Sequence, residues 1–153
     1  MTVRVQTADF DAGFELNQLR LLRPDTGAVV SFIGQVRDLN EGDNVSSLTL
    51  EHYPEMTEKA LQDIIAKAKS NWNIFDALII HRVGTLKPTE QIVLVAVTSA
   101  HRGEAFKACE FMMDYLKTEA PFWKKEKGVF GERWIEAKTT DDDAKLRWTA
   151  GNN

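Results

Sequence analysis

The sequence predicts an α+β fold with a mixed, mostly antiparallel sheet and two main helices. Apolar runs without charge, such as residues 28–36 and 91–98, alternate with stretches in which apolar residues recur every three or four positions. The order is strand, helix, several strands, helix and a strand pair, which lacks the strict alternation of a parallel α/β sheet. At 153 residues, with no internal repeat or low-complexity linker, residues 1–153 are expected to form one domain.

The first third contains three predicted strands and a helix. Val3 and Val5 alternate with polar residues, and Asp9 or Asp11 can cap a helix that runs to about Leu22. Residues 28–36, AVVSFIGQV, are β-branched and uncharged, which predicts a central strand buried on both faces. After a turn-forming loop at 37–44, alternation from Leu48 to Tyr53 predicts a half-buried strand.

The rest of the chain supplies the two main helices and the remaining strands. Pro54 breaks the preceding strand, Thr57 is the expected N-cap of the first main helix, and a second main helix ends near Ala120 because Pro121 follows. Strands are expected at 77–83 and 91–98, then a hairpin from 122–126 and 133–138 around Gly128 and Gly131, and a last short segment after the acids at 141–143. The two helical stripes are Met56, Ala60, Leu61, Ile64, Ile65, Ala68, Trp72 and Ala105, Phe106, Cys109, Met112, Met113, Leu116.

Charge and cysteine content exclude several classes of protein. The net charge of −4 and the lack of a basic stripe with interleaved aromatics argue against a nucleic-acid-binding protein. A lone cysteine, Cys109, excludes an internal disulfide framework and is expected in the core. No membrane span and no signal peptide are evident in the sequence, so we expect a cytoplasmic protein.

The usual catalytic and metal-binding motifs are absent from the sequence. It has no phosphate-binding glycine loop, nucleophile elbow or HExxH pair, and His52, His81 and His101 lie on separate predicted elements. We therefore expect neither a bound metal nor a cofactor.

Three places carry polar residues that packing does not readily explain. Ser99 to Gly103 lie where a buried strand hands over to a helix, so backbone N–H groups meet His101 and Arg102 in a potential anion site; the alternative is that Ser99 only caps the helix. Gln35, Val36 and Arg37 end an uncharged strand, and Arg37 equally fits the solvent end of that strand.

The third place is a group of lysines around the break at Pro121. Lys117 falls in the last helical turn, where the helix dipole favours a cation for structural reasons alone. Lys124 and Lys125 follow a rigid aromatic stretch that can hold a lysine near apolar walls, which suits proton transfer. If the three places converge, they form a cationic pocket suited to a small anion such as a phosphate ester.

Three longer segments are similar to the large, catalytic subunit of molybdopterin synthase. They are LTLEHYPEMTEKAL at 48–61, VTSAHRGEAFKACEFMMDYLKTEAPFWKKE at 97–126 and RWIEA at 133–137, and the similarity runs from about 28 to 148. The resemblance implies an α/β-hammerhead type of fold and a homodimer within a heterotetramer. Its partner would be a small ubiquitin-like sulfur carrier whose C-terminal Gly-Gly bears a thiocarboxylate, and its substrate would be cyclic pyranopterin monophosphate.

The resemblance also implies roles for individual residues. Lys117 and Lys124 match the family's catalytic lysines, the first beside the incoming tail and the second handling substrate and protons. Lys138 stands where some relatives are expected to carry an arginine that reaches across the dimer, and lysine cannot make the same bidentate phosphate contact. The expected substrate-binding residues are Gln35, Val36, Arg37, His101, Arg102, Lys117, Lys124, Lys125 and Glu126.

Two other functions remain open from the sequence. A non-catalytic scaffold could bind a ubiquitin-like tail or a phosphorylated small molecule without turnover, which explains a cationic pocket but not the paired lysines. An RNA-binding domain is disfavoured by the negative net charge.

Overall fold

The computed structural model describes residues 2–135, 143–146 and 148, and within them the chain forms two sheets and three main helices. The larger sheet has the strand order β1-β5-β7-β2, formed by β1 (Thr2–Gln6), β5 (Ala77–Arg82), β7 (Gln91–Ser99) and β2 (Ala28–Gln35). Only β1 and β5 are parallel; the other pairs are antiparallel. The α+β class with a mostly antiparallel sheet is therefore confirmed.

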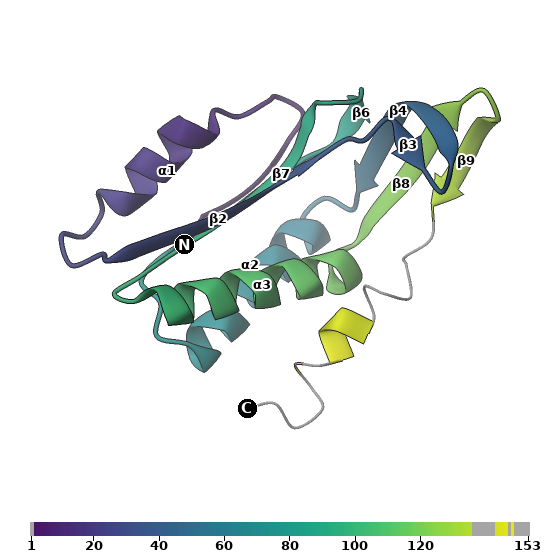
Figure 1. The fold of residues 1–153 in the computed structure, drawn as a ribbon. Helices are drawn as coiled ribbons and strands as arrows, with labels where there is room; N and C mark the ends of the chain where they lie inside the picture. Colours follow the sequence, from purple (N-terminus) through teal and green to yellow (C-terminus); the bar gives the residue numbers. More distant parts are fainter. Residues whose placement is uncertain (1, 136–142, 147, 149–153) are drawn as a thin grey trace.

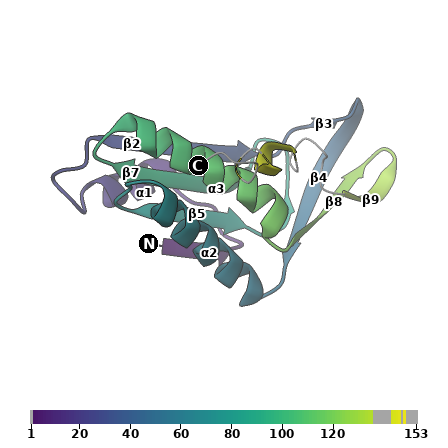
Figure 2. The ribbon, with the colours of Figure 1, turned by 90° about the horizontal axis from the view of Figure 1, so that it is seen from below.

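Helices cover both faces of the larger sheet (Figure 1). α2 (Met56–Asn71) and α3 (Arg102–Glu119) lie side by side on one face, where Leu61, Ile79, Val95 and Met112 belong to the main core (Figure 2). The shorter α1 (Ala12–Arg20) covers the other face, and Asp11 caps it as predicted, since its carboxylate accepts from the Phe14 N–H. The structure thus has the two main helices and the shorter N-terminal helix that the sequence predicts.

The second sheet extends from one end of the larger one (Figure 1). It runs β3-β4-β8-β9, with β6 (Gly84–Leu86) also paired to β4 (Asp43–His52). The short β3 (Leu39–Asn40) returns into β4, and β8 (Phe122–Gly128) forms the expected hairpin with β9 (Gly131–Ile135). The predicted strand residues 136–138 and the acids at 141–142 lie outside the described residues.

Two contacts join α2 and the larger sheet to the start of β8. Thr57 is fully buried in the first turn of α2; its hydroxyl donates to the Pro121 carbonyl and accepts from the Tyr53 N–H. The His81 ring of β5 stacks on Phe122, with centroids 3.8 Å apart and planes 17° from parallel. These contacts fix the direction in which the chain leaves α3.

The prediction that residues 28–36 form a central strand is wrong. β2 is an edge strand of the larger sheet, and Val29, Phe32 and Ile33 are each about two-fifths exposed. An uncharged β-branched run indicates that a strand is covered on both faces, but it does not say whether the cover comes from the same chain.

Three smaller predictions also need correction. The N-cap of α2 is Glu55, whose backbone N–H donates to Glu58, so Thr57 lies inside the helix. Phe106, predicted on the inner stripe of α3, is 59% exposed because it lies off the buried face that Ala105 and Cys109 share. The sequence predicts no strand between 83 and 91, because the three residues of β6 are too few to show a period.

Candidate functional site

The end of α3 and the start of β8 place two lysines close together. α3 ends at Glu119 because the residue before Pro121 is forced out of helical geometry, which leaves Lys117 in the last turn. Lys124 follows in β8, opposite Leu50 of β4, and shares the inner face of the strand with Phe122 and Glu126. Both lysines therefore face the junction of the two sheets.

Lys117 and Lys124 line a hollow of about 280 Å³ between the two sheets. Arg37 joins them from the chain segment that follows β2. Val36 holds this segment in place: its N–H donates to the Glu90 carbonyl at 2.9 Å, and its carbonyl accepts from Thr89 at 2.9 Å. Further lining comes from Gln35, Asn40 and Glu126 and from the apolar Leu39, Val45, Leu48, Ile92, Phe122 and Ile135. Three cations thus face one carboxylate, so the hollow suits an anion.

A second hollow, of about 270 Å³, lies on the other side of the lysines. Most of its lining residues are uncharged, among them Phe32 and Ile33 of β2, Leu116 of α3 and His81. The two hollows share Gln35, Ile92, Lys117, Phe122 and Lys124. Two bound molecules, one in each hollow, would therefore meet at the lysines.

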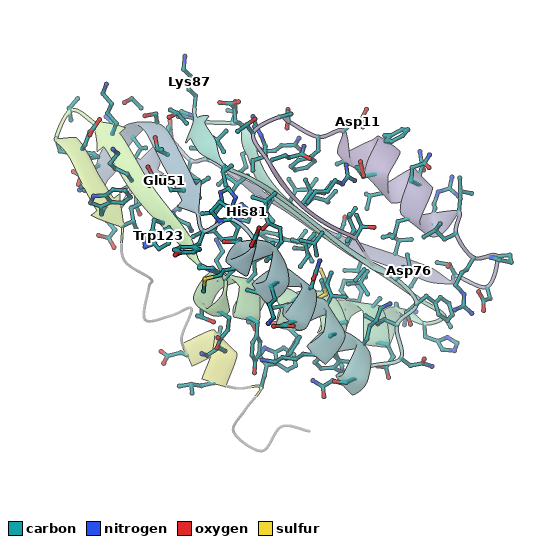
Figure 3. The ribbon with its side chains drawn as sticks, turned by 180° about the vertical axis from the view of Figure 1, so that it is seen from behind. Asp11, Glu51, Asp76, His81, Lys87 and Trp123 are labelled. Carbon is teal, nitrogen blue, oxygen red and sulfur yellow. The ribbon has the colours of Figure 1, made fainter. Side chains whose placement is uncertain are left out.

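His81 is a neutral imidazole at this junction (Figure 3). Its Nδ1 lies 2.8 Å from the Arg82 carbonyl, and because a carbonyl only accepts, Nδ1 carries the proton and Nε2 is an acceptor. Burial, with smaller contributions from the charges of Lys124 and Lys117, lowers the pKa of His81 to about 3 against the opposing effect of the Arg82 carbonyl. The ring therefore adds no positive charge to the lysine pair at neutral pH.

A polar network ties the tip of the β3–β4 hairpin to the β8–β9 hairpin. Glu126, 4% exposed, accepts at Oε1 from Asn40 Nδ2 at 2.9 Å and from Arg133 Nε at 3.1 Å. Arg133 also donates to Asp43 at 3.0 Å. The network holds Glu126 and Asn40 at the wall of the first hollow.

Not all of the predicted site residues meet within one chain. The structure brings together Gln35, Val36, Arg37, Lys117, Lys124 and Glu126. Lys125 points to the other face of β8, where its amine lies 3.5 Å from Glu132 and 5.3 Å from the Trp134 ring centroid. His101 and Arg102 are exposed at the opposite end of α3, about 22 Å away along the helix axis.

The alternative that Ser99 caps α3 does not hold. The N-cap position belongs to His101, and the Ser99 hydroxyl donates instead to the Asn73 carbonyl at 2.8 Å. Lys138 lies outside the described residues.

Cys109 has the predicted core position. It is 5% exposed, and burial raises the pKa of its thiol to about 11, which makes a nucleophilic role unfavourable. Among residues 2–135, 143–146 and 148 there is no cluster of histidine, cysteine, aspartate or glutamate suited to a metal ion. Helices long and apolar enough to cross a membrane are likewise not found in that part of the chain.

Two residues of the site were missed by sequence reasoning. Sequence reasoning treats His81 only as a possible metal ligand, although a histidine directly after the apolar run ALII is a signal for a buried polar group. Asn40 looked like one more turn former, and nothing local in the sequence shows that its amide meets Glu126, 86 positions later.

Comparisons with known proteins identify the family of this chain. The model of the family described as "MoaE protein" matches residues 5–119. The chain belongs to the MoaE family. A molybdopterin synthase catalytic subunit from Ralstonia nicotianae is 63% identical over 147 residues, which cover 96% of this chain and 84% of that protein.

Solved structures of MoaE proteins share the fold. The molybdopterin biosynthesis MoaE protein from Burkholderia ambifaria has a TM-score of 0.83 and 55% identity, with 97% of each chain covered. A chain in the complex of subunits 1 and 2 of molybdopterin-converting factor from Helicobacter pylori matches with a TM-score of 0.70, 20% identity and 90% of each chain covered. At that identity the second likeness concerns the MoaE fold alone.

Proposed function

We propose that this chain is the catalytic subunit of a molybdopterin synthase. It would transfer sulfur from the thiocarboxylated C-terminal Gly-Gly of a small ubiquitin-like partner to cyclic pyranopterin monophosphate, forming the dithiolene of molybdopterin. Membership of the MoaE family and the names of the curated relatives support the reaction class. The reduced thiocarboxylate and the lone thiol of Cys109 both suit the cytoplasm.

The meeting of two hollows at Lys117 and Lys124 carries this proposal. A transfer between two reactants requires that both reach the same groups from different directions. The first hollow has the Arg37 guanidinium and suits the phosphorylated pterin. The second hollow, whose lining residues are mostly uncharged, suits the uncharged glycine backbone of the partner's tail.

Each transfer exchanges oxygen for sulfur without net oxidation or reduction. The thiocarboxylate sulfur forms a C–S bond to a pterin side-chain carbon as that carbon loses a C–O bond. Water then attacks the partner's carbonyl carbon and breaks its C–S bond, so the partner leaves as a carboxylate and the sulfur stays on the pterin. Lys117 would stabilise the oxyanion formed during the attack by water, and Lys124 would donate a proton to the oxygen leaving the pterin.

A second copy of the chain would complete the site. Among the strands that the structure describes, none pairs with the outer edge of β2, which exposes Val29, Phe32 and Ile33 and is the kind of edge that pairs with another strand. Antiparallel pairing of two β2 edges would bring the start of β2 in one copy beside the end of β2 in the other.

This dimer accounts for the distant histidine and arginine. The start of β2 lies next to the beginning of α3, since Gly27 N–H donates to the Ser99 carbonyl at 3.0 Å. His101 and Arg102 of one copy would thus approach Gln35 and Arg37 of the other and add two phosphate-binding groups. With one partner docked on each copy, the assembly would be a heterotetramer.

The test uses purified components: this chain, a thiocarboxylated partner and cyclic pyranopterin monophosphate, with the dithiolene product measured after conversion to a fluorescent derivative. The wild-type chain forms the product, and Lys117→Ala abolishes it while partner binding and the melting temperature stay unchanged. Lys107→Ala, which removes an exposed lysine from the same helix, serves as the control. Near-normal product from Lys117→Ala contradicts the assignment, and tail binding without any product in the wild type supports the non-catalytic scaffold instead.

A further inference from the structure

The imidazole of His81 has one nitrogen atom that the fold does not use. Nδ1 donates its proton to the Arg82 carbonyl at 2.8 Å, and one face of the ring stacks on Phe122. These two contacts fix the ring, of which only 3% is exposed. Nε2 is therefore an acceptor of known orientation, and none of the described residues donates a hydrogen bond to it.

This nitrogen atom opens into the second hollow. In the described part of the chain, Asn40 Oδ1 is the one fully enclosed side-chain nitrogen or oxygen atom that lacks a hydrogen-bond partner. Nε2 of His81 also lacks a partner, so it is not fully enclosed by protein atoms. His81 lines the second hollow and is absent from the lining of the first. A molecule in the second hollow can therefore reach Nε2.

Side-chain acceptors are scarce in the second hollow. Lys117 and Lys124 can only donate, and the other lining side chains, apart from Gln35 and His81, are hydrocarbon. Gln35 is exposed at the end of β2. His81 is buried, and the charges of both lysines act on its ring. His81 is thus the buried side-chain acceptor beside the lysine pair.

An extended peptide tail in this hollow needs acceptors as well as donors. Its carbonyl groups and terminal thiocarboxylate accept hydrogen bonds and suit the lysines. Its N–H groups donate, and a buried N–H without an acceptor costs about 1–3 kcal/mol. The N–H of the last residue is separated from the terminal carbon only by the α-carbon, so a tail that ends at the lysines also brings this N–H close to them.

We infer that His81 Nε2 accepts the N–H of the last glycine of the partner's tail and thereby positions the reacting carbonyl carbon at Lys117. This inference rests on the proposed function, which places that tail in the second hollow. It gives a role to the neutral state of the imidazole, because a protonated ring would present a second donor to the glycine N–H.

Two other roles for His81 must be separated from this one. A purely structural role uses Nδ1 and the stacked face of the ring and leaves Nε2 without a function. In the other case, the ammonium group of Lys117 or Lys124 turns to Nε2 when the hollow is filled. In neither case does the N–H of the last glycine matter, so the test removes that N–H.

The first arm of the test changes the tail and leaves this chain intact. The ubiquitin-like partner of the synthesis assay is made with two synthetic tails, one ending in Gly-Gly and one in which glycolic acid replaces the last glycine, so that an ester oxygen replaces the N–H. Both end in an ordinary carboxylate, so calorimetric titration measures binding alone. The wild type is expected to bind the ester tail about tenfold more weakly, because two acceptors then face each other. Equal affinities, or no binding of the Gly-Gly form, overturn the inference.

The second arm changes the histidine. His81→Phe keeps a flat ring beside Phe122 but has no acceptor, so it should bind both tails with the same affinity, about tenfold below that of the wild type for Gly-Gly. His52→Phe makes the same change at the histidine that pairs with Phe122 across β4 and β8, and it should discriminate like the wild type. A His81→Phe chain that still discriminates between the tails overturns the inference.

The third arm needs only the wild type and decides the question if His81→Phe does not fold. The chain is labelled with ¹⁵N-histidine, and the Nε2 resonance of His81 is followed during titration with each tail. Accepting a hydrogen bond moves this resonance to lower frequency, so the Gly-Gly form should move it and the ester form should not. An equal response to the two tails overturns the inference.

The two proposals fail in different ways. A wild-type chain that prefers the Gly-Gly tail but forms no dithiolene from the thiocarboxylated partner contradicts the proposed reaction and leaves the role of His81 standing. A chain that forms the dithiolene but binds both tails equally contradicts the role of His81 alone.

Discussion

Acid should destabilise this protein through His81 before most carboxylates titrate. The imidazole has an ordinary pKa of 6.5, which the fold lowers to about 3 by burial and by the nearby Lys124, Lys117 and His52. Below pH 6.5 the unfolded chain therefore binds a proton that the folded chain does not, so stability falls as pH falls through this window. The loss approaches about 1.4 kcal/mol per pH unit and reaches about 2 kcal/mol at pH 5.

The measurement is urea unfolding between pH 7 and pH 5, followed by tryptophan fluorescence. His81→Asn keeps a donor for the Arg82 carbonyl but cannot titrate, so it should lower stability at pH 7 through lost packing on Phe122 and flatten the pH dependence below it. His101→Asn, which changes an exposed imidazole, is the control. If wild type and His81→Asn lose stability at the same rate with pH, the imidazole is not kept neutral by the fold.

Two further predictions concern the proposed dimer and the hydrogen bonds of Thr57 in α2. Coexpression of Lys117→Ala and Arg102→Ala chains, each inactive alone, should restore about a quarter of wild-type activity if Arg102 acts across the dimer. Half of the dimers are then hybrids, and each hybrid contains one intact site of two. No restoration of activity would show that both residues act in the site of the same chain. Thr57→Val removes the hydroxyl that bonds Tyr53 and Pro121 and should lower the free energy of unfolding by about 1–3 kcal/mol. Thr57→Ser retains that hydroxyl and should recover most of the loss in thermal unfolding.

Local patterns in the sequence were enough for most elements of the fold. The stripes of α2 and α3, the Asp11 cap and the break at Pro121 each depend on residues within a few positions of one another. The position of β2 in its sheet depends on which strands pair, and hydrophobicity does not report this. For the same reason the exposed apolar side chains of β2 gave the signal of a central strand.

For the site residues, too, local relations could be predicted from the sequence and long-range relations could not. Lys117 and Lys124 lie seven positions apart around one helix end, so their proximity follows from local geometry. Arg37 joins them only because α3 packs against β2, the strand that precedes Arg37. Sequence reasoning could propose this convergence but not establish it. Asn40 and His81 depend on partners that are distant in sequence or on the depth of burial, and both were found only in the structure.

The length of the hairpin tip between β3 and β4 sets the position of Asn40 relative to Glu126. Glu41 and Gly42 have φ angles of 51° and 86°, and this two-residue connection pairs Asn40 with Asp43. One residue inserted at the tip would shift the register of β3 against β4 by one position, and each later side chain of the shifted strand would then face the opposite side of the sheet. The length of the tip thereby decides whether Asn40 or a neighbouring side chain bonds to Glu126. Substitutions at the tip are therefore expected to be tolerated far better than insertions.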